Sequence, residues 1–124
     1  MNVALWIIAG LLAVAFFLAG LMKVAQPKEK LAASGMAWVD DFPAGGVKAI
    51  GVVEVLGAIG LILPGALDIA PVLVPLAATG LAVTMLGAAV VHGRRKESQS
   101  IGANVILLAL AAVVAWGRFG PYAF

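Results

Sequence analysis

One acidic residue, Glu54, interrupts an apolar stretch that runs from Val47 to Leu63. A carboxylate about seven residues into a helix lies about 10 Å from the helix start, because an α-helix rises about 1.5 Å per residue. An ionisable group at that depth is costly in lipid and normally faces other helices or a cavity. Such a group could carry a proton or act as a general base. We therefore expect Glu54 to face the interior of a helical bundle.

Three more polar residues stand at the ends of apolar stretches. Lys23 ends the first stretch, His92 ends the third, and Asn104 lies near the start of the fourth. If four helices cross a membrane in alternating directions, all three residues lie on the same side as Glu54. Histidine can exchange a proton near neutral pH, and an amide can orient a ligand. The sequence thus predicts an intramembrane polar site formed by Lys23, Glu54, His92 and Asn104.

A structural role fits the same residues. A hydrogen-bonded clamp among them would fix the order of the helices without any chemistry. Lys23 alone could be an anchor whose ammonium reaches the lipid phosphates, His92 an interfacial ring, and Asn104 a link between helices. The sequence does not decide whether Glu54 is charged, because burial and a neighbouring ammonium act in opposite directions.

The composition indicates that lipid is the solvent of this chain. Of its 124 residues, 64% are hydrophobic and 11% are charged, and the mean hydropathy is +1.13. Soluble domains carry about a quarter charged residues. The chain has no cysteine and one histidine, so we expect neither a dithiol redox site nor a metal site. Its few basic residues are too scattered for a nucleic-acid surface.

A membrane span takes about 20 residues, so this length allows four spans and short connections. We predict an all-α integral membrane protein, a single four-helix domain over 1–124. The predicted spans are 3–24, 46–63, 71–92 and 101–118. All six prolines fall between spans or in a first turn, where a missing N–H costs little. The first span lacks the features of a cleaved signal, and we expect it in the mature protein.

The connection between the first two spans mixes charged and apolar residues at roughly helical spacing, from Lys28 to Phe42. We interpret it as a short interfacial helix, although a loop resting on the membrane fits as well. Trp38 suits the headgroup level, and Asp40 or Asp41 could cap the second span.

Basic residues predict the orientation, because Lys and Arg near span ends stay in the cytoplasm. Of the eight, Arg118 alone lies at the end of the fourth span. The other seven flank the first and third connections: Lys23, Lys28, Lys30, Lys48, Arg94, Arg95 and Lys96. We therefore expect both termini outside and connections 1–2 and 3–4 in the cytoplasm of a bacterial cell.

Small residues predict where helices approach closely. Gly51 lies on the helix face of Glu54, and Gly80, Thr84 and His92 share another face at spacings of four. The expected packing residues are Gly51, Gly57, Gly80, Thr84 and Gly87. They could form seams within one bundle or a contact in a homo-oligomer, and we favour seams.

Three segments together resemble the DoxX-like family of small four-helix bacterial membrane proteins: AGLMKVAQP, PAGGVKAIGVVEVLGAIGLILP and MLGAAVVHGRRKE. The most specific feature is Gly51 three residues before Glu54, followed by Leu61 and Pro64. Lys23 and His92 also match family positions, and Asn104 matches more loosely.

The resemblance implies this fold and a location in the cytoplasmic membrane. The wider group includes subunits of a thiosulfate:quinone oxidoreductase and MauE-like proteins, which implies association with a larger membrane redox complex. The absence of cysteine departs from the thiol-handling relatives. We expect an accessory or scaffold subunit of a redox or stress-related complex, with quinone or lipid near Glu54. There are two alternatives: a small proton-coupled transporter, and a membrane enzyme that uses Glu54 and His92 as an acid–base pair on a lipid-soluble substrate.

Overall fold

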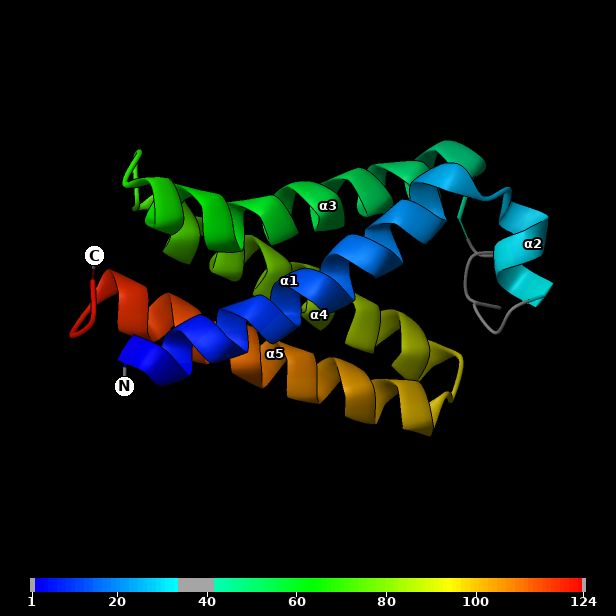
Figure 1. Ribbon diagram of the computed structural model, residues 1–124. Coiled ribbons are helices and arrows are strands. Elements are labelled where there is room, and N and C mark those ends of the chain that lie inside the picture. The colour runs from blue at the N-terminus through cyan, green and yellow to red at the C-terminus, as the bar shows by residue number, and fades with distance from the viewer. Residues whose placement is uncertain (1, 34–41, 124) are drawn as a thin grey trace.

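The computed structural model describes residues 2–33 and 42–123, with the side chains of 28, 44, 98 and 99 left out. Over these residues the chain is helical and contains no strand, so the predicted all-α class is confirmed (Figure 1). The helices are α1 (Asn2–Ala25), α2 (Lys28–Ala33), α3 (Ala44–Leu67), α4 (Leu73–Arg94) and α5 (Ser98–Phe119).

Four of these helices are long and apolar enough to cross a membrane, which confirms the predicted spans in number and order. The third helix, α3, ends a turn later than predicted, at Leu67, and contains Pro64. Proline is tolerated there because it removes one hydrogen bond near the end of the helix. The helix then stops at Asp68, whose φ of 54° is left-handed and whose N–H donates to the Pro64 carbonyl.

The short helix between the first two spans is also present, as α2. Its Leu31 is completely buried and packs with Val47 of α3, and Met22 and Phe42 border this small cluster. Burial of a leucine at this point ties α2 to the ends of α1 and α3. The expected roles of Trp38, Asp40 and Asp41 fall outside the described residues.

The four spanning helices form two pairs, α1 with α3 and α4 with α5, joined mainly by contact between α3 and α4. Both termini and the α3–α4 connection lie at one end of the bundle, which we call the terminal end (Figure 1). The α2 region and the α4–α5 turn lie at the other end, which we call the linker end. The two pairs diverge toward the linker end.

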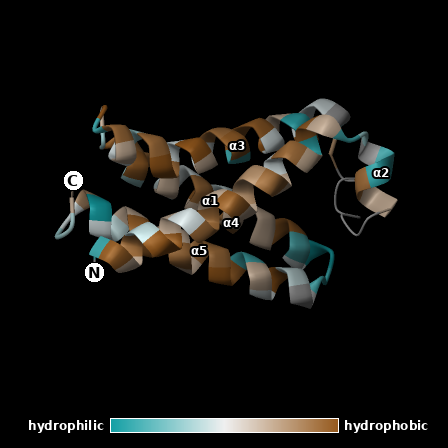
Figure 2. Cartoon of the chain, in the orientation of Figure 1, coloured by the Kyte–Doolittle hydropathy of each residue, from teal (hydrophilic) through white to brown (hydrophobic). Residues whose placement is uncertain are grey.

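The exterior of the bundle is apolar along most of its length, and hydrophilic residues gather at the two ends (Figure 2). Only 22–28% of each spanning window is buried inside the protein, yet large exposed side chains such as Val3, Leu11 and Val83 are hydrophobic. In water this surface would aggregate, whereas in a bilayer it faces acyl chains of the same polarity. The core between the helices is formed by Leu12, Phe16, Leu61, Ala78, Leu81 and Val114, among others.

Candidate functional site

The contact between α1 and α3 depends on two glycines that face each other. A Cβ added to Gly20 would lie 2.6 Å from the Gly51 carbonyl oxygen, and a Cβ added to Gly51 would lie 2.8 Å from that of Gly20. The two backbones therefore touch, which only glycine permits. Each glycine precedes a charged residue by three positions, Lys23 and Glu54, and residues i and i+3 share a helix face. The glycine contact thus turns both charges toward the same interface.

Lys23 and Glu54 form a buried ion pair across this interface. The Lys23 Nζ donates to Glu54 Oε1 at 2.6 Å, and the two residues are 7% and 2% exposed. Neither charge is stable alone in so apolar a place, so each is compensated by the other. Lys23 is therefore directed into the bundle and not outward as a lipid anchor.

A pocket of about 500 Å³ lies beside this ion pair, between the two helix pairs in the linker half of the bundle. All four residues of the predicted polar site line it, from four different helices: Lys23, Glu54, His92 and Asn104. Most of the remaining lining is apolar or small and includes Ala15, Phe16, Ile50, Met85, Ala88 and Leu107. The pocket therefore combines an apolar wall with a few polar groups, the usual make-up of a small-molecule site.

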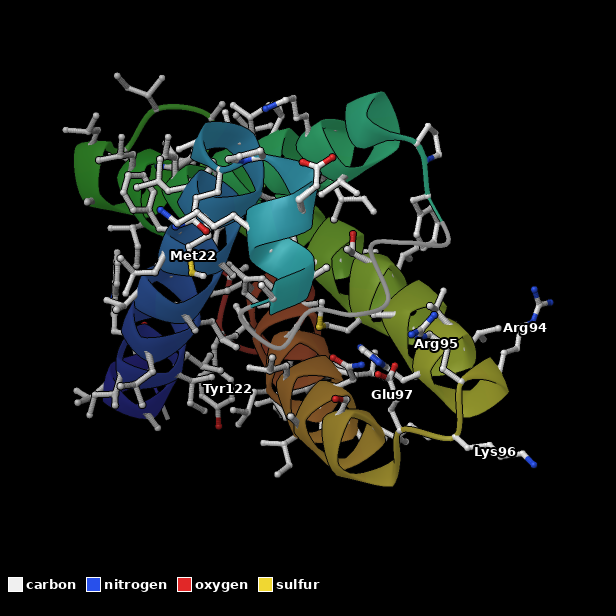
Figure 3. The ribbon with its side chains drawn as sticks, turned by 90° about the vertical axis from the view of Figure 1, so that its right-hand side faces the viewer. Met22, Arg94, Arg95, Lys96, Glu97 and Tyr122 are labelled. Carbon is white, nitrogen blue, oxygen red and sulfur yellow. The ribbon has the colours of Figure 1, made fainter. Side chains whose placement is uncertain are left out.

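His92 does not bond to Glu54 but to Glu97, a residue that the sequence analysis did not single out. The His92 Nδ1 and Glu97 Oε1 lie 2.8 Å apart, and the Arg95 Nε lies 3.3 Å from the same oxygen. Figure 3 shows Arg95 and Glu97 turned toward the bundle, while Arg94 and Lys96 extend away from it. The described contacts thus place the pocket histidine beside a carboxylate at the linker end.

The tight α4–α5 turn produces this pairing. Lys96 has a left-handed φ of 58°, and the Glu97 N–H donates to the His92 carbonyl at 2.9 Å. The chain reverses within a few residues and folds Glu97 back over the end of α4. No helical spacing relates the two residues. Gly93, the glycine before the Arg-Arg-Lys run, lies inside α4, and the left-handed position of the turn is held by Lys96 instead.

Asn104 is the fourth polar residue of the pocket and differs from the other three. It is 9% exposed, and its Nδ2 is buried with no hydrogen-bond partner in the part of the chain that the structure describes. Buried amide groups in proteins are nearly always paired. Among the described residues, this nitrogen forms no link between helices, which was one of the expectations for Asn104.

The small residues divide into two groups. Gly51 and Gly57 are close helix contacts, since a Cβ on Gly57 would lie 2.7 Å from the Leu81 side chain. At Gly80 and Gly87 a Cβ would meet nothing within 4 Å, and the Thr84 hydroxyl donates to the Gly80 carbonyl of its own helix. Within the described chain, close helix contact is thus seen at Gly51 and Gly57 and not at Gly80 or Gly87, because helical spacing defines a face but not where another helix meets it.

A second polar cluster, also not anticipated, closes the terminal end. Arg118 is 5% exposed, and its Nη1 donates to Asn2 Oδ1 at 2.6 Å and to the Tyr122 carbonyl at 2.9 Å. Its guanidinium lies 5.7 Å from the centre of the Trp6 ring, within cation–π range. These contacts join the start of α1 to the end of α5.

Within the described residues, no three potential metal ligands gather in one place. The described residues of the candidate site are connected by the Lys23–Glu54 ion pair and the His92–Glu97 hydrogen bond. Beside these lie an apolar wall and an amide that is unsatisfied among the described residues.

One of the comparisons with known proteins finds a match. No curated protein and no solved structure matches this sequence. The sequence profile of the DoxX-like family matches residues 7–114, which span all four long helices and the four polar residues of the pocket. The chain belongs to the DoxX-like family.

Proposed function

We propose that this protein binds a small membrane-soluble molecule in the linker-end pocket and acts there as a subunit of a larger membrane redox complex. The observation that carries the proposal is the pocket itself, about 500 Å³ with an apolar wall and polar groups from four helices. Small-molecule sites in proteins occupy about 300–1,000 Å³ and have this composition.

A quinone is the ligand class that we propose. Its ring and tail match the apolar lining, and its carbonyl oxygens can accept hydrogen bonds from an amide or an ammonium group. Both kinds of donor line the pocket, in Asn104 and Lys23.

We place the linker end in the cytoplasm of a bacterial cell, because most of the basic residues lie there. A ligand of the bilayer would then be held at the cytoplasmic half of the membrane. A partner protein of a redox complex would meet the pocket from the same side.

The pairing of Glu54 with Lys23 favours binding over proton-coupled transport. A transporter of this kind needs a carboxylate that alternates between proton and substrate, and Glu54 already has a buried cation 2.6 Å away. The contacts also disfavour a direct acid–base pair of Glu54 and His92. Glu54 bonds to Lys23, and His92 bonds to Glu97.

The test is a binding measurement on the purified protein in lipid nanodiscs with decylubiquinone as the probe. We expect saturable binding and a rise in the melting temperature, because a ligand of the folded state stabilises it. Met85→Trp, which fills the pocket, should abolish both effects, while Val83→Trp on the exposed face of α4 should preserve them. Equal binding by the two variants would refute a site in the pocket.

A further inference from the structure

The amide of Asn104 is the one polar group of the pocket whose bonding the described structure leaves incomplete. The residue is 9% exposed and lines the pocket, and its Nδ2 has no partner among the described residues. Burial without a partner costs a protein stability, so such groups are rare unless a ligand or water completes them. An amide can donate or accept, and its oxygen and nitrogen exchange places by rotation about the Cβ–Cγ bond.

Each acidic group described around the pocket faces a basic side chain. The Lys23 ammonium faces the Glu54 carboxylate at 2.6 Å, and His92 faces Glu97, which Arg95 also approaches. An ionic ligand would enter an apolar pocket whose described charges already have counter-charges. The loss of its hydration would then be poorly compensated.

We infer that the ligand of this pocket has an uncharged oxygen, a carbonyl or a hydroxyl, that forms a hydrogen bond with the Asn104 amide. This inference rests on the proposed function and narrows it. It excludes ionised amines and fatty acids as ligands, and it makes Asn104 the residue that selects the polar group. The apolar body of the ligand lies against the wall formed by Phe16, Met85 and Leu107.

The position of Asn104 gives the bound ligand a defined place in the bundle. Asn104 belongs to α5, whereas Lys23 and Glu54 belong to the other helix pair. A ligand that bonds to Asn104 and fills the pocket therefore contacts both helix pairs where they diverge.

The experiment compares three probes that share a ten-carbon tail, using the full-length protein in nanodiscs at neutral pH. Decylubiquinone is uncharged, decyltrimethylammonium is a cation and undecanoate is an anion. We expect decylubiquinone to bind at least about tenfold more tightly than either ionic probe, because they lose more hydration on entry.

The variants are Asn104→Leu, which keeps the size but removes the hydrogen bond, and Asn104→Ala in case leucine does not fit. Ile106→Ala, on the lipid-facing side of α5, is the matched control. We expect the Asn104 variants to bind decylubiquinone about tenfold more weakly. Without ligand, Asn104→Leu should melt at the same temperature as the unmodified protein or higher, because an unsatisfied amide has been removed.

The outcomes separate the two proposals. Binding of decylubiquinone that neither Asn104 variant weakens, tighter binding of an ionic probe, or a lower melting temperature of ligand-free Asn104→Leu would overturn this inference and leave the proposed function standing. Failure of all three probes to bind would overturn the proposed function itself.

Discussion

The two ends of the bundle use buried polar residues in opposite ways. At the terminal end, Arg118 bonds to Asn2 and to the Tyr122 carbonyl, and Leu5 fills the space left by Gly117. At the linker end, the helix pairs diverge around a pocket, and the amide nitrogen of Asn104 lacks a partner among the described residues. Polar groups therefore close one end and leave the other incomplete. In an apolar chain, the end with an unsatisfied group is where a ligand should be sought.

The largest effect should come from breaking the buried ion pair at the linker end. Glu54→Leu removes the carboxylate that faces the buried Lys23 ammonium, and breaking a buried ion pair from one side typically costs about 3–5 kcal/mol. The double variant Lys23→Met, Glu54→Leu should recover most of this loss, since both halves of the pair are then replaced by apolar side chains. Chemical denaturation in mild detergent measures all three proteins. A double variant no more stable than Glu54→Leu would show that the pair is not the source of the effect.

The next largest effect should come from the glycine contact that directs the pair. Gly20→Ala places a Cβ 2.6 Å from the Gly51 carbonyl oxygen. Because that oxygen belongs to the backbone of α3, the clash can be relieved only if α1 and α3 move apart. Overpacking of this kind costs about 1–3 kcal/mol, and we expect the upper part of that range. Gly10→Ala on the same helix meets nothing within 4 Å and is the matched control. Similar losses in both variants would contradict the proposed contact.

A smaller effect is expected at the terminal end. Arg118→Met removes two hydrogen bonds from a charged donor, which should cost about 2 kcal/mol. Spin labels near the start of α1 and the end of α5 should then report a broader distance distribution. Ligand binding at the linker end should persist, because the substituted cluster lies at the opposite end. Loss of binding in this variant would mean that the two ends do not act independently.

The smallest effect concerns Glu97, whose side chain is 28% exposed. Its contribution to stability should be below about 1 kcal/mol. Its effect on His92 is nevertheless measurable, because the chain has one histidine and ¹⁵N labelling gives a single ring. When neutral, that ring should carry its proton on Nδ1, facing Glu97. Glu97→Gln, which keeps an acceptor oxygen, should preserve this form, and Glu97→Ala should remove it. The same tautomer in all three proteins would rule out this role of Glu97.

The sequence was sufficient for the architecture because each span is a long apolar run bounded by charges or proline. Alternation of four spans also places Lys23, His92 and Asn104 at the end where Glu54 enters, and all four residues do line one pocket. Composition and topology thus predict which residues lie at the same end of the bundle.

Individual contacts lay beyond reach of the same reasoning. The bond between His92 and Glu97 depends on a left-handed Lys96 in the turn, and the bond between Arg118 and Asn2 joins opposite ends of the chain. Helical periodicity could not separate Gly51, which touches a neighbouring backbone, from Gly80, which does not. These details depend on how far each helix rotates about its axis, and that is decided by all the contacts together.

The pairing of Lys23 with Glu54 also bears on how the protein is made. A carboxylate in the interior of a lone helix raises the free energy of transferring that helix into lipid by a few kcal/mol. Synthesis proceeds from the N-terminus, so the helix that carries Lys23 enters the membrane before the helix that carries Glu54. The cation is therefore already in place when the acid arrives. The order of the helices along the chain thus offers the Glu54 carboxylate a counter-charge as its own helix enters lipid.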